Sequence, residues 1–205
     1  MKKSMIVMML IFCVLVLSAG NSQALNISGS IWYPADSQAQ NPAGGPPPGP
    51  ANATFTVQQL NFVALSGPVT YGDFLSGGAL NPNVLSWVTN SGVGAVNMYT
   101  SPGLGSFFQF VWEQYVTPGT LVTVTHDDGF SLQVGTVLYD YSTPTSPITS
   151  NFNLTSPAGS YILTLNYGAW NSYPEVLQAR VPEPMTMLLL GLGLVGLAGV
   201  RRFRK

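Results

Sequence analysis

The chain has 205 residues, of which only 7% are charged, against roughly 25% in typical soluble domains. Residues 25–180 hold seven acids and one base, Arg180, which gives this stretch a formal net charge of −6. A nucleic-acid-binding surface needs clustered Lys and Arg, so the composition excludes that class of protein. The 9 Tyr, 10 Phe and 4 Trp indicate a packed core and argue against disorder.

The first 24 residues have the three parts of a secretory signal. Two lysines follow Met1, residues 5–17 are uninterruptedly apolar, and residues 22–24 supply small side chains for signal peptidase. We predict an N-terminal signal helix, residues 1–24, that signal peptidase removes; a short membrane anchor is the alternative. The only cysteine, Cys13, lies in the apolar run, so the mature chain is expected to lack disulfides.

A Pro- and Gly-rich tract, residues 41–50, lies in an N-terminal segment that we delimit as residues 25–53. Proline removes a backbone donor and glycine weakens regular structure, so we expect neither helix nor strand in the tract. A linker and a long surface loop both remain compatible with it.

From residue 54 to residue 180, apolar residues recur with a period of two, which is typical of half-buried β-strands. After Gln58 and Gln59 the alternation changes phase, as a β-bulge would require. No interior stretch has the period of a long amphipathic helix. We therefore predict an all-β ectodomain over residues 54–180, an antiparallel β-sandwich of the jelly-roll type. The clearest strand patterns cover residues 108–112, 122–125, 130–134 and 161–167.

Rare residues cluster between two of these strands. His126, the only histidine, precedes Asp127 and Asp128, the only adjacent acids, and Gly129 follows them. We expect these polar side chains at a strand end or in a loop. Because Asp-Asp-Gly also favours tight turns, a solvated turn without chemistry is the plain alternative.

The segments VTVTHDDGFSLQVG (residues 122–135) and PAGSYILTLNYGAWNSYPEVLQ (residues 157–178) resemble the protective-antigen-type β-sandwich of bacterial toxins, glycosidases and adhesins. The resemblance covers about residues 105–180. In the lectin members, two aspartates joined by a cis peptide hold Ca²⁺ with an asparagine from a later loop, and the ion contacts sugar hydroxyls. The resemblance thus implies Asp127, Asp128 and Asn171 as calcium ligands. Trp170 and His126 are candidate sugar contacts, and a position in the core is the equal alternative for Trp170.

Enzymatic interpretations lack the residues they need. One histidine and no cysteine beyond the signal argue against zinc, and no G-x-S-x-G element marks a serine nucleophile. Adjacent carboxylates do not straddle a glycosidic bond as glycoside hydrolysis requires. We predict no catalytic residues and a protein that is not an enzyme.

The C-terminus has three parts in a fixed order: a Pro-Glu-Pro tripeptide, an apolar run at residues 185–200 and a basic end. Sixteen residues at ~1.5 Å each span about 24 Å, which flanking Arg side chains can extend by snorkelling. We predict a transmembrane helix at residues 185–200 with residues 25–180 outside the cytoplasm. The tripeptide is Pro182-Glu183-Pro184, and the basic residues are Arg201, Arg202, Arg204 and Lys205.

This order resembles the PEP-CTERM protein-sorting signal of Gram-negative bacteria that make exopolysaccharide, whereas a plain tail anchor would need only the last two parts. The resemblance covers residues 181–205. It implies that a membrane exosortase recognises the tripeptide, cleaves near it, and releases or transfers the ectodomain. The expected route is a membrane-anchored precursor that becomes a cell-surface or extracellular protein.

Two functions fit these observations. The first is a non-enzymatic surface or matrix protein associated with exopolysaccharide or biofilm, whose low-charge polar surface suits a polysaccharide environment. The second is a calcium-dependent carbohydrate-binding module that uses the Asp127-Asp128 loop. The expected partners are signal peptidase, exosortase and exopolysaccharide or other glycans.

Overall fold

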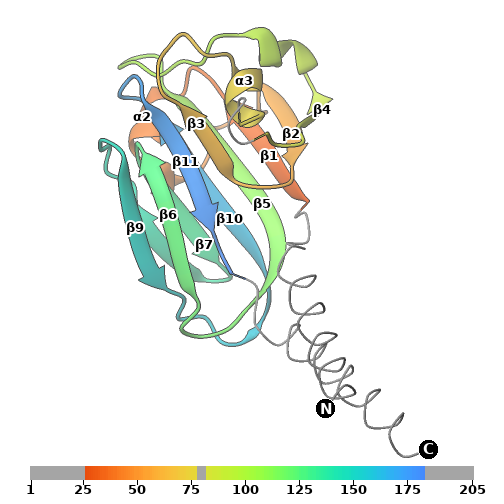
Figure 1. Ribbon diagram of the computed structural model, residues 1–205, viewed down its shortest axis with the longest axis vertical. Coiled ribbons are helices and arrows are strands. Elements are labelled where there is room, and N and C mark those ends of the chain that lie inside the picture. Colours follow the sequence, from red (N-terminus) through yellow and green to blue (C-terminus); the bar gives the residue numbers. More distant parts are fainter. Residues whose placement is uncertain (1–25, 78–81, 183–205) are drawn as a thin grey trace, which may run out of the picture. The chain divides into compact units, whose positions relative to one another are not determined.

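The computed structural model of the protein describes residues 26–77 and 82–182, which belong to one compact unit. Two antiparallel β-sheets lie face to face in this unit, which confirms the predicted sandwich (Figure 1). The larger sheet has the order β4-β2-β1-β5-β10-β7-β8, and the smaller has the order β3-β11-β6-β9. The strands are β1 (Ile27–Trp32), β2 (Ala53–Val57), β3 (Asn61–Ala64), β4 (Ser86–Thr89), β5 (Ser106–Val116), β6 (Leu121–Asp127), β7 (Phe130–Val134), β8 (Val137–Tyr141), β9 (Ile148–Asn153), β10 (Gly159–Ala169) and β11 (Glu175–Arg180).

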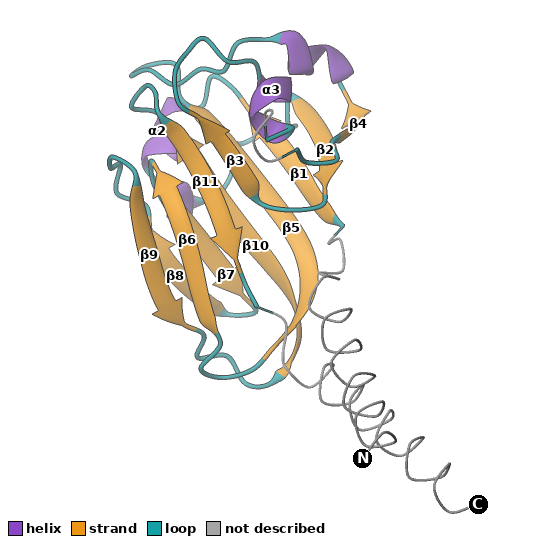
Figure 2. Ribbon diagram, in the orientation of Figure 1, coloured by secondary structure: helices purple, strands orange, loops and turns teal. Residues whose placement is uncertain are grey.

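Helices are short and lie outside the two sheets (Figure 2). They are α2 (Asp36–Gln40), α3 (Tyr71–Leu75) and two 3₁₀ helices, η1 (Pro42–Gly44) and η2 (Ser91–Ala95). No helix in residues 26–77 and 82–182 is long and apolar enough to cross a membrane. The signal helix, Glu183, Pro184, the predicted transmembrane helix and the basic end all fall outside the described residues.

Burial follows the alternation in the sequence. In β5, Phe108, Phe110 and Trp112 are buried, and the residues between them are more exposed. In β6, Val122 and Val124 are buried in the same way. Alternating apolar side chains thus place one face of each strand between the sheets.

The sandwich begins at β1, earlier than the boundary at residue 54. β1 pairs with β2 on one side and with β5 on the other, so it lies inside the larger sheet. Ile27 and Ile31 are buried on its inner face, but Gly29 between them carries no apolar side chain and hides the alternation. Glycine is required there because a Cβ atom would lie 2.2 Å from the Phe55 ring.

The Pro- and Gly-rich tract is a surface loop packed on the larger sheet. The expectation of no helix in the tract is wrong, because the 3₁₀ helix η1 begins at Pro42, a first-turn position that proline tolerates. This helix places the carbonyl of Pro42 within reach of two buried side chains. The Ser131 hydroxyl donates to this carbonyl at 3.3 Å, and the Asn166 amide donates to it at 3.2 Å. The loop therefore belongs to the domain and is no linker.

The change of phase after Gln59 marks a crossing between sheets. β2 ends at Val57 in the larger sheet, and β3 begins at Asn61 in the smaller one. The expected bulge is therefore wrong, because two separate strands replace one irregular strand.

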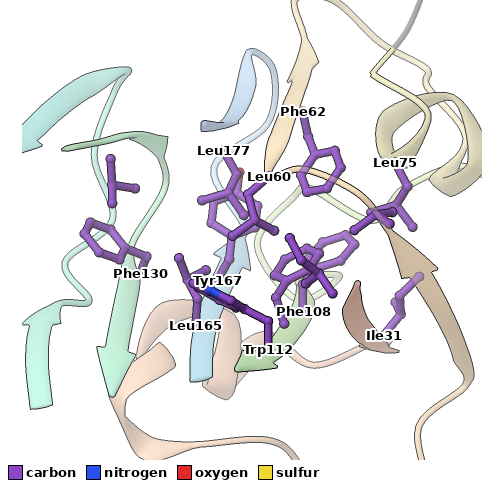
Figure 3. Close-up of a cluster of buried hydrophobic side chains, with 14 of the residues drawn as sticks. Ile31, Leu60, Phe62, Leu75, Phe108, Trp112, Phe130, Leu165, Tyr167 and Leu177 are labelled. Carbon is purple, nitrogen blue, oxygen red and sulfur yellow. The ribbon is translucent and has the colours of Figure 1, made fainter. Parts of the chain in front are cut away.

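Apolar side chains from both sheets and from α3 fill the space between the sheets, as the buried cluster in Figure 3 shows. Phe62 stacks on Phe110 with ring centroids 5.4 Å apart, and Phe108 lies 5.8 Å from Tyr167. Burial of one such ring contributes about 2–3 kcal/mol. The core thus stabilises a domain that has no cysteine in its described residues.

Candidate functional site

Three strands bring the aspartate pair next to the loop after β10. β6 ends at Asp127, which lies opposite Val176 of β11, and β10 ends at Ala169. Trp170 and Asn171 lie between the end of β10 and the start of β11, and therefore at the same end of the sandwich as Asp127. The structure brings together four of the residues that the sequence singled out, Asp127, Asp128, Trp170 and Asn171.

Asp128 is held in place by the loop that follows β10. Its Oδ2 atom accepts hydrogen bonds from the backbone N–H groups of Trp170, at 2.6 Å, and Asn171, at 2.7 Å. The side chain is fully buried, and its Oδ1 atom has no hydrogen-bond partner. The peptide bond between Asp127 and Asp128 is cis. One carboxylate oxygen is thus fixed, and the other lacks the partner that buried polar atoms normally have.

Both carboxyl groups of the pair are energetically unfavourable as anions. Burial, and then the charge of Asp128, raise the pKa of Asp127 to about 7. Burial also raises the pKa of Asp128, although the hydrogen bonds from the backbone of Asn171 and Trp170 partly oppose this rise. The only base in residues 25–180, Arg180, lies at the opposite end of β11.

Tyr167 and Glu175 form a second polar layer beneath the pair, which the sequence analysis did not identify. The Tyr167 hydroxyl is hydrogen-bonded to the Asp127 carbonyl and to Glu175 Oε2, the latter at 2.7 Å. Glu175 is fully buried, its Oε1 atom has no partner, and burial raises its pKa well above the usual range. One hydroxyl hydrogen cannot serve two acceptors, so a protonated Glu175 that donates to Tyr167 satisfies both contacts.

Asp36 of α2 fixes the polar edge of Trp170. Its Oδ1 atom accepts a hydrogen bond from the Trp170 indole N–H and another, at 2.7 Å, from the backbone of Gly103. Trp170 is half-buried, whereas Asn171 is exposed. Because acids are rare in this chain, Asp36 and Glu175 could have been singled out as candidate site residues. Nothing in the sequence indicated the residues that they contact.

His126 lies inside the sandwich. Only 3% of it is exposed, and burial lowers its pKa. Its Nδ1 atom lies 2.6 Å from the Asp128 carbonyl oxygen, and its Nε2 atom lies 2.9 Å from Ser150 Oγ. With both ring nitrogens engaged, His126 supports the backbone of the pair and offers no polar atom to a sugar.

The donor set suits a hard cation. Among residues 26–77 and 82–182 there is no group of three or more His, Cys, Asp and Glu side chains that could hold a metal ion. Two carboxylates and the amide oxygen of Asn171 are oxygen ligands of the kind that Ca²⁺ takes, whereas zinc requires His or Cys. The unpartnered Asp128 Oδ1 atom and the nearby Asp127 carboxyl group therefore fit calcium.

We expect the calcium-free domain to lose about 1–3 kcal/mol of stability between pH 5 and pH 8. Glu175 and Asp127 have folded-state pKa values above their unfolded values, so the folded state binds more protons. This stabilisation is complete below the unfolded pKa, near 4, and is lost as the pH rises through the folded pKa, about 7 for Asp127. His126 opposes the trend only below about pH 6.5, because its pKa is lowered.

Urea unfolding without calcium at pH 5 and pH 8 measures this difference. The variant Glu175→Gln removes one of the titrating groups and should reduce it. Equal stability at the two pH values would contradict the assignment.

The C-terminal part of the sequence matches a known family. Residues 180–205 match the PEP-CTERM protein-sorting motif, which confirms the resemblance of the tripeptide, apolar run and basic end. The chain therefore carries a PEP-CTERM sorting signal, which implies exosortase-dependent export. No curated protein sequence matches the chain significantly.

Solved structures identify the fold of the described domain. The PA14 domain of the antifreeze protein MpAFP is similar with a TM-score of 0.54 and 18% identity, over 75% of this chain and 79% of that domain. The PA14 sugar-binding domain from an RTX adhesin is similar with a TM-score of 0.48 and 18% identity, over 77% of this chain and 88% of that domain. The likeness to the MpAFP domain shows that the β-sandwich has the PA14 fold, as the resemblance implied.

Parts of larger enzymes are also similar. A β-glucosidase from Kluyveromyces marxianus matches with a TM-score of 0.45 and 10% identity, over 80% of this chain. The match covers only 18% of the β-glucosidase chain.

Proposed function

We propose that this protein is a non-enzymatic surface protein, exported through its PEP-CTERM signal, whose β-sandwich binds glycans through Ca²⁺. Asp127 and Asp128 are the proposed calcium ligands. A matrix protein without a glycan site is the alternative, and it differs only at this loop.

The observation that carries the proposal is the state of Asp128. Two backbone N–H groups fix its Oδ2 atom, and its Oδ1 atom is buried without a partner beside a second buried acid. A solvated turn would leave these carboxylates in water, where they gain full hydration. Burying two adjacent carboxylates as anions is unfavourable unless a cation neutralises their charge.

Each residue has a role in the proposed site. Asp127 and Asp128 would supply the charge that holds Ca²⁺, and Asn171 would add a neutral oxygen. Ca²⁺ takes 6–8 oxygen ligands, so two carboxylates and one amide leave positions that vicinal sugar hydroxyls fill. The bound ion would polarise those hydroxyls and fix the sugar ring. Trp170, with its indole edge held by Asp36, offers an oriented ring at the border of the site.

The same geometry argues against catalysis. The Asp128 carboxyl group is fully buried and is held by the backbone N–H groups of Trp170 and Asn171, which does not suit a general acid or base in glycoside hydrolysis. His126 has both nitrogens engaged, so it is no general base.

The sorting signal supports a route through the membrane. We propose that signal peptidase cleaves the N-terminus, that exosortase processes the C-terminus, and that the released or transferred domain meets exopolysaccharide at the cell surface. The scarcity of charged side chains in the domain suits a polar polysaccharide environment.

Calcium titration into the domain of residues 25–183 tests the proposal. We expect calorimetric binding, and at 100 times the Kd calcium should raise the free energy of unfolding by about 2.7 kcal/mol. Asp128→Asn keeps an oxygen for the two N–H groups but removes one charge. It should weaken calcium affinity at least tenfold and leave the apo fold equally stable or slightly more stable.

Glu113→Gln is the matched control, because Glu113 is an exposed acid of β5. It should change neither calcium affinity nor stability. If the wild type shows no binding at millimolar calcium, the glycan-binding proposal fails and the matrix-protein alternative stands. A glycan array with calcium and with a chelator then identifies the sugar class.

A further inference from the structure

The chain leaves the folded domain directly at the sorting tripeptide. β11 ends at Arg180, and Pro182, the first residue of the tripeptide, follows after one residue. That residue, Val181, packs against the hydrophobic core. The segment recognised during sorting therefore begins on the surface of the sandwich, with no linker before it.

Gln114 of β5 binds the backbone of this exit segment. The side chain points to the core side of the sheet and is only 6% exposed. Its Nε2 atom donates hydrogen bonds to the carbonyl oxygens of Val181, at 2.9 Å, and Pro182, at 3.5 Å. An amide nitrogen has two hydrogens, so it can make both bonds at once.

Trp112 sets the orientation of this amide group. Trp112 and Gln114 are two residues apart on the same face of β5, and both are buried. The indole N–H is only a donor, and it binds Gln114 Oε1 at 3.0 Å. The Gln114 Nε2 atom must therefore face the exit segment. A buried amide group costs free energy unless its polar atoms have hydrogen-bond partners, which an apolar side chain does not need. Here Trp112 is the partner of the amide oxygen, and the exit segment provides the partners of the amide nitrogen.

We propose that Gln114 is a positioning residue for C-terminal sorting, which holds Val181 and Pro182 on the domain and so slows exosortase processing. The proposal rests on the processing that the PEP-CTERM signal implies. A membrane protease that binds its substrate as an extended chain needs the backbone carbonyls of that segment. In the folded domain these carbonyls are bound to Gln114, and the Val181 side chain beside them is packed on the core. The segment must therefore detach from the domain before the protease can bind it.

Processing of the full-length precursor in its exosortase-containing host measures the effect. In a pulse-chase experiment, Gln114→Met keeps the length and buried shape of the side chain but removes its donors. Because one or two hydrogen bonds are lost, the detached fraction should rise, and processing should become about 5–30 times faster. Gln109→Met is the matched control, since Gln109 lies on the outer face of the same strand and donates to Asn166. It should be processed at the wild-type rate.

Loss of stability is a separate way to speed processing, so Ile31→Ala serves as a second control. Ile31 is fully buried in β1 and lies opposite Phe108, six residues before Gln114 on β5. If Ile31→Ala is processed as fast as Gln114→Met, the rate reports unfolding and the proposal is overturned. An unchanged or slower rate for Gln114→Met also overturns it, while export and calcium binding stand. If the wild-type chain is not processed at all, both this inference and the proposed export route fail.

Discussion

Replacement of Pro182, Glu183 and Pro184 by alanines is expected to abolish C-terminal processing completely. The exosortase would lose the element that it recognises, while the apolar residues 185–200 still insert into the membrane. The variant should accumulate as a membrane-held precursor that retains residues 185–205. Intact mass measurement of the membrane and released fractions distinguishes the two forms.

A proline elsewhere provides the control for this experiment. Pro118→Ala changes an exposed proline in the turn between β5 and β6, and it should leave processing unchanged. Released wild-type protein that still carries residues 185–205 would refute the expected cleavage.

Tyr167→Phe should lower the free energy of unfolding by about 2–5 kcal/mol. The change removes one hydroxyl group and keeps the aromatic ring in the core. Without the hydroxyl, the Asp127 carbonyl and Glu175 Oε2 lose a buried partner, and Glu175 then has no partner at either oxygen. Urea unfolding of residues 25–183 at pH 7 measures the loss.

Tyr161→Phe is the matched control, because Tyr161 lies on the same strand and is only partly buried. It should change stability by less than about 0.5 kcal/mol. A double-mutant cycle with Glu175→Leu tests the assigned contact, since the two losses should not add. Additive losses would show that Tyr167 acts through packing alone.

The sequence predicted the strands that have an uninterrupted alternation of buried and exposed residues. β5, β7 and β10 contain the predicted runs, because alternate apolar side chains on a strand must share one face. It did not predict β1, since Gly29 contributes to the inner face through the Phe55 ring that covers it. That contact joins two strands and leaves no trace in the local sequence.

The candidate site, too, was only partly predictable from the sequence. Asp127 and Asp128 were identifiable because charged residues are so rare, and the resemblance added Asn171 and Trp170. Asp36 lies 134 residues before the tryptophan that it binds, and no local pattern relates the two. Tyr167 has an inward position like the other apolar residues of β10, so its hydroxyl contacts were hidden.

The antiparallel pairing of β6 with β11 separates the aspartate pair from the point where the chain leaves the domain. Asp127 lies beside the start of β11, and the segment that leads to the sorting signal leaves from its end, six residues later. At about 3.3 Å per residue, this strand separates the aspartate pair from the exit by roughly 20 Å. The loop after β6 and the exit segment therefore lie at opposite ends of the sandwich. For the proposed glycan site, this separation favours a ligand that approaches from the end away from the C-terminal exit, such as a polymer in the surroundings or on a neighbouring cell.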